Sequence, residues 1–373
     1  MKKHLLLTLV LLTSCFSNPE SNDSEKSVAD SEINFEKTGQ KIFEVDSITD
    51  YNLYYPSYYS SKAVLSCLNP SQNSIDLYDY ELGVLKKRIG FKKGEPNNIK
   101  ADLFGYQIIN DETLFVIDKI GNLYISDWDG KIRKSINLDP EGIPGGPLII
   151  PNLIPAFQHG ELFYLENYYL SNPDRLMKIA LDTASGHVDY RLTLPTESVE
   201  GFWGLGDFSY YNCVIKKDSI IYNFPNLDSL YIYDRELNPL GKVSAKSRNI
   251  DSPVEKLLDI NNIPPESYLK IAAFTSSIYS RLIYDEYQNL YYRIVGKPIN
   301  DTLLNSGDPI KSTEREYSVV IFDSQFNWKG EFELPDYEYD MAMERILVTP
   351  EGLLIQTKGD NEDMAVFDIY GKT

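Results

Sequence analysis

Residues 230–238 read LYIYDRELN, an apolar and aromatic run that ends in Asp234 and is followed by Asn238. Aromatic and β-branched residues of this kind suit a pleated, buried strand. An Asp side chain accepts hydrogen bonds from nearby backbone N–H groups, and Gly or Asn tolerates the positive φ of a tight turn. The stretch therefore predicts a β-strand that ends in a hairpin turn.

The same pattern occurs six times along the chain, with Gly or Asn three or four residues after the Asp. The pairs are Asp79 and Gly83, Asp127 and Gly130, Asp182 and Gly186, Asp234 and Asn238, Asp323 and Asn327, and Asp368 and Gly371. Other short apolar runs precede most copies, and an alternating run follows, which gives about four strands per copy. We predict an all-β fold, a six-bladed β-propeller of four-stranded blades.

Successive Asp residues of the pattern are 48, 55, 52, 89 and 45 residues apart. Most of these spacings fit the period of about 40–50 residues that is typical of propeller blades. The longest gap either hides a seventh blade or belongs to an enlarged fifth blade. Two inserts favour the second interpretation: a short helical insert near Ser252 and Pro253, which fit a helix cap and first turn, and a loop over residues 297–316.

The chain ends at Thr373, directly after the sixth predicted turn, so the last blade lacks one strand. The segment Lys41–Val45 is a strand-like run that belongs to none of the predicted blades. We predict that it completes the sixth blade and closes the ring, because closure also removes an edge that could pair with another chain.

The N-terminus has the features of an export signal. Two lysines precede the apolar segment Leu5–Leu12, which is too short to span a bilayer. Leu12-Thr13-Ser14-Cys15 resembles a lipobox, and the resemblance implies cleavage after residue 14 and lipidation of Cys15; an ordinary secretory signal with a chance Cys is the alternative. Residues 15–40 are predicted to be a polar, flexible tether, and residues 41–373 the propeller.

Phe16 follows the cysteine where an inner-membrane retention signal most often has Asp. We therefore expect an outer-membrane lipoprotein whose propeller faces either the periplasm or the outside. The formal charge of −19 becomes −21 once Lys2 and Lys3 are removed with the signal. This charge repels nucleic acid and anionic lipid headgroups, and we expect no nucleic acid as a partner. It favours cationic or neutral partners, with solubility alone as the simpler explanation. The expected partners are the membrane, through the lipid anchor, and a glycan or an envelope protein.

Cysteine and histidine, which supply the nucleophile and the base in many active sites, are scarce. Cys67 and Cys213 fall in strands of blades one and four, too far apart for a disulfide, and we expect buried free thiols. His159 and His187 lie beside predicted turns, which is not where Ser-His-Asp or Cys-His chemistry places its base. The acidic clusters do not complete a metal-binding loop. We therefore predict no catalytic, metal-binding or cofactor-binding residue, and no cofactor.

The inter-blade loops of a propeller converge around the mouth of its channel. Here these loops are predicted at residues 51–59, 201–208, around Ser252 and at 336–340. Aromatic residues in loops are candidates for stacking on sugars or holding a partner, although they could instead plug the channel. The candidate ligand-binding residues are Phe202, Trp203, Tyr337 and Tyr339, with Arg175 and Arg248 as sources of positive charge.

The chain resembles the six-bladed propeller lipoproteins of Bacteroides-type bacteria, within a family that is catalogued as a domain of unknown function. The residues that carry the resemblance are the lipobox, the strand 73–79 with its turn at Gly83, and the segment 91–97. Related propellers often have a Gly-x-Gly-Pro sequence in that segment, where this chain has Glu95 at the second Gly. The resemblance implies the fold and the location in the cell envelope, and it implies no activity.

Three functions remain open from the sequence. The first is a non-catalytic binding or scaffold module on the envelope that engages a glycan, a peptide or a partner protein. The second is a glycan hydrolase or lyase, which needs converging carboxylates, or a Tyr with a base, at the channel mouth. The third is a structural subunit of an envelope complex, which predicts a large apolar surface patch.

Overall fold

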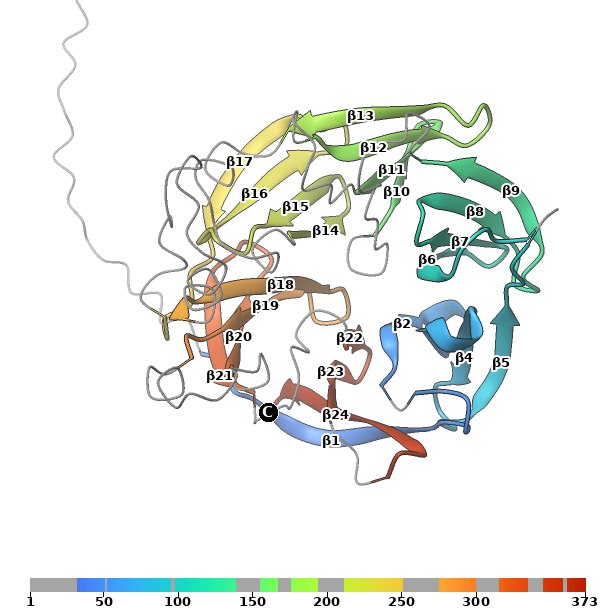
Figure 1. Cartoon of the computed structure of the whole chain (residues 1–373). Helices are drawn as coiled ribbons and strands as arrows, with labels where there is room; N and C mark the ends of the chain where they lie inside the picture. The colour runs from blue at the N-terminus through green and yellow to red at the C-terminus, as the bar shows by residue number, and fades with distance from the viewer. Residues whose placement is uncertain are drawn as a thin grey trace, which may run out of the picture. The chain divides into compact units, whose positions relative to one another are not determined.

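Six four-stranded antiparallel sheets make up the described part of the chain, and Figure 1 shows them as blades around a common centre. The computed structural model describes residues 32–50, 52–94, 98–138, 155–166, 176–193, 211–250, 275–299, 315–334, 345–357 and 361–373. In every blade the strand nearest the centre pairs with only one neighbour (Figure 1). This arrangement confirms the six-bladed propeller and places the described strands between Asp234 and Asp323 in the fourth and fifth blades.

The first five blades follow the chain in order, from the inner strand to the outer one. Their strands are β2 (Tyr54–Tyr59), β3 (Val64–Asn69), β4 (Ser74–Asp79) and β5 (Leu85–Gly90); β6 (Leu103–Asn110), β7 (Thr113–Asp118), β8 (Asn122–Ser126) and β9 (Ile132–Asn137); β10 (Phe157–His159), β11 (Leu162–Glu166), β12 (Leu176–Asp182) and β13 (Val188–Thr193); β14 (Asn212–Lys216), β15 (Ser219–Asn223), β16 (Ser229–Asp234) and β17 (Pro239–Ser244); and β18 (Ile278–Asp285), β19 (Leu290–Gly296), β20 (Tyr317–Phe322) and β21 (Trp328–Glu333). Two short 3-10 turns, Ser60–Lys62 and Pro70–Gln72, join strands of the first blade.

The sixth blade is built from both ends of the chain. It contains β22 (Ile346–Thr349), β23 (Gly352–Thr357) and β24 (Met364–Lys372), and its outer strand is the N-terminal β1 (Phe35–Glu44), which is antiparallel to β24. The predicted closure is therefore confirmed. The strand starts at Phe35, so residues 35–40 belong to the blade and not to the tether in which they were predicted.

Five of the six predicted hairpin turns are confirmed. In each of them Oδ1 of the Asp accepts hydrogen bonds from backbone N–H groups of the turn. Gly83, Gly130 and Gly186 have φ of 70°, 80° and 83°, as the turn requires. The role given to Asn238 and Asn327 was wrong, because the positive φ falls one residue earlier and each Asn instead donates to the Asp side chain.

The sixth predicted turn, at Asp368 and Gly371, is wrong. Asp368 lies within β24 and is only 4% exposed. Its carboxylate accepts a hydrogen bond from Gln40 at 2.9 Å and pairs with Lys37 at 2.7 Å, and both partners come from β1. A long-range strand pairing thus satisfies the acid that the local sequence assigns to a turn.

Other predictions fall on strands or outside the described residues. Cys67 in β3 and Cys213 in β14 are buried free thiols, as predicted. Residues 54–59, predicted as a loop, form β2 instead. The helical insert near Ser252 lies outside the described residues, as does most of the loop at 297–316. In the described part of the chain, no helix has the length and apolarity to span a bilayer.

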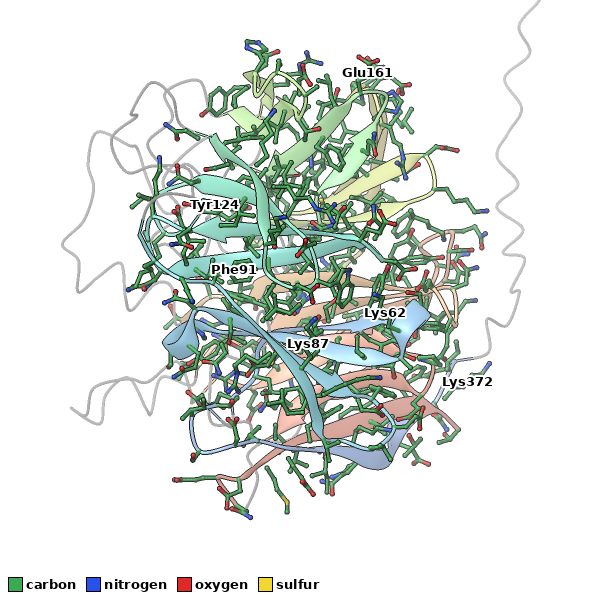
Figure 2. The ribbon with its side chains drawn as sticks, turned by 90° about the vertical axis from the view of Figure 1, so that its right-hand side faces the viewer. Lys62, Lys87, Phe91, Tyr124, Glu161 and Lys372 are labelled. Carbon is green, nitrogen blue, oxygen red and sulfur yellow. The ribbon has the colours of Figure 1, made fainter. Side chains whose placement is uncertain are left out.

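The two ends of the ring differ. The end that we call the turn end holds the short turns from the first to the second strand of each blade, at residues 60–63, 111–112, 160–161, 217–218, 286–289 and 350–351. Figure 2 shows Lys62 and Glu161, from two of these turns, toward the right, and Phe91, which follows β5, toward the left. The inter-blade connections leave from the opposite end.

Two equivalent glycines test how closely β1 is held. A Cβ at Gly83 would lie 2.3 Å from the carbonyl oxygen of Ile42 in β1, whereas a Cβ at Gly186 would meet nothing within 4 Å. We expect Gly186→Ala to lower the free energy of unfolding by about 1–2 kcal/mol, the cost of a left-handed residue. Gly83→Ala should cost about 1–3 kcal/mol more, because the turn must move away from β1. Urea denaturation measures both, and equal losses would contradict a close contact between the Gly83 turn and β1.

Candidate functional site

A cavity of about 430 Å³ lies at the centre of the ring and is lined by all six blades. Its walls come from the inner strands β2, β6, β14, β18 and β22, and from Pro155 just before β10. Tyr59 ends β2 and Glu286 belongs to the turn after β18, so the cavity lies toward the turn end of the ring. Because each inner strand is paired on one side only, its other edge directs backbone N–H and C=O groups toward this space.

Irregular strand pairing shapes the wall at two places. The register of β2 shifts between Tyr54 and Ser57, with Tyr55 at a φ of 52°, and the register of β18 shifts between Tyr279 and Arg281. Ser57 and Arg281 both line the cavity directly after these bulges. A β-bulge changes the direction in which the following side chains point and is common beside functional sites.

Hydrogen bonds between blades hold the inner strands in place around the cavity. The Gln107 side chain exchanges two bonds with the backbone of Ala156, at 2.6 Å and 3.0 Å, and so joins blades two and three. Arg281 donates to the carbonyl of Ile346 at 3.0 Å and joins blades five and six. Asn212 exchanges bonds of 2.7 Å and 3.0 Å with Leu282 of the fifth blade. The cavity wall is therefore cross-linked by side chain to backbone bonds.

The phenols at the cavity are hydrogen-bond donors and not bases. Burial, with the nearby carboxylates of Glu81 and Glu351, raises the pKa of Tyr58. Burial and the carboxylates of Glu286 and Asp285 raise the pKa of Tyr284 in the same way. A tyrosine that acts as a general base needs a lowered pKa. These tyrosines remain protonated near neutral pH and offer aromatic faces and O–H groups.

A buried polar cluster lies behind the wall at the interface of blades three and four. Glu166 of β11 contacts the ammonium of Lys178, its cross-strand partner in β12, and both residues are at most 1% exposed. Tyr222 and Tyr211 donate to the Glu166 carboxylate at 2.9 Å and 3.2 Å. Cys213, which also lines the cavity, approaches the same carboxylate at 3.8 Å. Burial raises the pKa of the Cys213 thiol, so this cysteine is unreactive.

Of the residues that the sequence predicts for ligand binding, the structure describes only Arg248. Phe202, Trp203, Tyr337, Tyr339, Arg175 and the lipidation residue Cys15 all lie outside the described residues and stay predictions. Arg248 is described, and its guanidinium stacks 3.5 Å from the centroid of the Trp328 ring. Its backbone N–H donates to Glu331 at 3.0 Å. Arg248 thus ties the segment after β17 to the outer strand of the next blade and does not line the cavity.

Sequence reasoning missed most of the cavity residues. Tyr58 and Tyr59 fell inside a predicted loop, but Arg281, Tyr284 and Glu286 had no motif to mark them. The available signal was their position at the ends of inner strands, which can be recognised only after each strand has been assigned to its place in a blade. In the part of the chain that the structure describes, no group of three His, Cys, Asp or Glu side chains is placed to hold a metal ion.

The chain is similar in sequence to one protein family and similar in fold to several solved structures. A family model described as a domain of unknown function, DUF4221, matches residues 32–333. A solved DUF4221 member from Bacteroides vulgatus ATCC 8482 is 21% identical, with a TM-score of 0.72 over 92% of this chain and 99% of that one. A solved protein from Bacteroides fragilis NCTC 9343, named as an exported protein, is 11% identical, with a TM-score of 0.50 over 92% and 96%. At these identities the likeness shows the fold alone, and none of the curated proteins compared with the chain matches it.

The buried pair of Glu166 and Lys178 should support the cavity wall. We expect Lys178→Met to lower the free energy of unfolding by about 3–5 kcal/mol, because it leaves a buried carboxylate without its cation. Lys178→Met combined with Glu166→Gln should recover most of that loss, since no buried charge remains. Chemical denaturation of the single and double variants measures the coupling. Additive losses would show that the two groups do not act as a pair.

Proposed function

The chain belongs to the DUF4221 family, whose function is unknown, and we propose that it is an envelope-anchored binding propeller. Its site is the central cavity, which holds a small ligand. The observation that carries this proposal is the convergence of all six blades on one cavity with aromatic and polar walls. Its volume of about 430 Å³ falls in the usual range of small-molecule sites, about 300–1,000 Å³.

The composition of the wall favours a saccharide among the ligands that the sequence leaves open. Tyr58, Tyr59 and Tyr284 supply aromatic faces against which a sugar ring can stack. Gln107, Arg281 and Glu286 supply donors and acceptors beside them. Cross-linked walls also lower the cost of ordering the site when a ligand binds.

Catalysis is less well supported than binding. Glycoside hydrolysis ordinarily uses two carboxylates on either side of the scissile bond. Among the described residues that line the cavity, Glu286 is the single carboxylate. The raised pKa values of Tyr58 and Tyr284 also disfavour a lyase with a tyrosine base. A ligand held here would be bound without being cleaved.

The location of the protein in the cell envelope is also part of the proposal. The lipobox Leu12–Cys15 supports a lipid anchor at Cys15, and the export of the Bacteroides fragilis protein of similar fold is consistent with a place in the envelope. We expect Cys15→Ala to move the protein from the membrane fraction to the soluble fraction, or to leave the signal uncleaved, because only a thiolate can accept the diacylglyceryl group. Detergent partitioning of native cells measures this. Unchanged partitioning would contradict the lipid anchor. It would not bear on the proposal that the cavity binds a ligand.

Filling the cavity tests the binding proposal. Val348 lines the cavity and is half-buried, and we expect Val348→Trp to occupy part of the space without unfolding the blade. Ile120→Trp is the control, because Ile120 is 59% exposed in the turn between β7 and β8, which is at the opposite end of the ring. The probe is a panel of neutral and acidic disaccharides, detected by saturation-transfer NMR.

The expected result is that at least one disaccharide binds to the parent and to Ile120→Trp, and binds at least about 10-fold more weakly to Val348→Trp. Melting temperatures of the three proteins show whether each variant is folded. Binding that survives in a folded Val348→Trp protein would place the site outside the cavity. No binding of any disaccharide to the parent would overturn a saccharide as the ligand.

A further inference from the structure

Three cations meet at the turn end of blade four, beside the cavity. Lys216 ends β14, Lys217 belongs to the turn that follows, and Arg235 belongs to the turn between β16 and β17. Arg235 donates to the carbonyl of Lys217 at 2.6 Å and to that of Gln158 at 3.3 Å. Within the described part of the chain, none of the three cations has a carboxylate at ion-pair distance.

The described cations of the ring fall into two groups, those with a carboxylate partner and those without one. Lys216, Lys217 and Arg235 belong to the second group, as do Lys62 and Arg293. At the same end of the ring, Lys41 pairs with Glu351, Lys86 with Asp79 and Arg133 with Asp127. Acids also lie near the three cations: Asp218 shares the turn of Lys217, Glu236 contacts His159, and Asp323 accepts from Asn327 and pairs with Lys329.

Lys216 is held beside residues that line the cavity. Its Nζ lies 4.6 Å from the centroid of the Tyr284 ring and 5.0 Å from that of Tyr291. It donates one hydrogen bond, to Oδ1 of Asn289 at 3.0 Å, and the hydroxyl of Tyr284 donates to the same oxygen at 3.0 Å. Tyr284 and Ile215, the residue before Lys216, both line the cavity. The ammonium is therefore held over the ring of Tyr284, one of the aromatic residues of the cavity wall.

An ammonium group has three N–H donors, and Lys216 uses one of them within the described structure. Burial, and to a smaller extent the neighbouring Lys217, lowers the pKa of Lys216, while the charge of Asp323 acts in the opposite direction. An anionic group at this place would gain two charge-assisted hydrogen bonds and would relieve the repulsion between the lysines.

We propose that the cavity selects an anionic saccharide, whose carboxylate or sulfate group binds the ammonium of Lys216 beside Tyr284. This proposal rests on the binding function proposed above. Lys217 and Arg235 lie at the same side of the mouth, together with the acids Asp218, Asp234 and Glu236 of the same two turns. The opposite charge of Glu286, which is exposed at the cavity, disfavours an anion elsewhere on the rim.

Three probes and two matched variants test the proposal. The probes are a disaccharide with a terminal glucuronic acid, its neutral counterpart with glucose, and a singly sulfated form of the neutral sugar. Lys216→Met removes the charge and keeps an unbranched chain over the aromatic rings. Lys62→Met is the control, because Lys62 lies at the same end of the ring, 3.9 Å from the centroid of the Trp128 ring, and has the same kind of contact.

We expect the parent protein to bind at least one of the two acidic probes about 10-fold more tightly than the neutral one in calorimetry at low salt. Lys216→Met should abolish this preference for the acidic probe, whereas Lys62→Met should keep it. Added salt should weaken binding of the acidic probe alone. The preferred probe, glucuronic acid or sulfate, identifies the anionic group.

Two outcomes would overturn the proposal. The first is equal affinity of the parent for the acidic and neutral probes. The second is equal loss of the acidic preference in Lys216→Met and Lys62→Met. If the acidic and neutral sugars bind with equal affinity and Val348→Trp blocks both, the cavity remains the binding site and only the choice of an anion fails. If no probe binds to the parent, the binding function and the anionic ligand fail together.

Discussion

The pairing of β1 with β24 is the constraint on which the rest of the molecule depends. It covers the open edge of the sixth blade and joins the first part of the folded chain to the last. Phe43 of β1 is fully buried, with its ring 5.8 Å from those of Tyr78 in blade one and Phe367 in blade six. The backbone N–H of Glu44 also donates to Gly83, in the outer turn of blade one, at 2.7 Å. One strand thus fixes the contact between the first and the last blade, and with it the positions of the inner strands.

Most of the fold could be predicted from local sequence because each hairpin turn carries its own chemistry. The Asp of the turn is satisfied within four residues, so the signal at Asp127 or Asp182 needs no knowledge of the rest of the chain. Asp368 shows where this reasoning fails. Its sequence surroundings match those of the turn residues, but Lys37 and Gln40, over three hundred residues away, provide its partners. Short-range patterns do not distinguish an acid capped locally from one capped across a strand pair.

The candidate site was harder to predict for a related reason. Loop aromatics stand out in a sequence because no strand explains them, whereas Tyr284 and Arg281 resemble ordinary strand residues. What makes them notable is the meeting of six inner strands, which belong to segments spread from Tyr54 to Thr349. Bulges in β2 and β18 then decide which side chains reach the cavity. The strands can be recognised in the sequence from their apolar patterns. The convergence of the inner strands and the bulges have no corresponding sequence motif.

Lys216 differs from the buried cations Arg293 and Lys178 in the partners that its charge has. The guanidinium of Arg293 is fully buried, and it donates to Asn223 and to the carbonyls of Leu227, Asp228 and Ala245 at 2.6–2.8 Å. Lys178 is equally buried and contacts a carboxylate. In both cases the fold compensates the cost of desolvating a charge with several partners or an opposite charge. Lys216 is partly desolvated by two tyrosine rings and has one neutral acceptor. A cation that the fold positions but does not neutralise is suited to a partner from outside the chain.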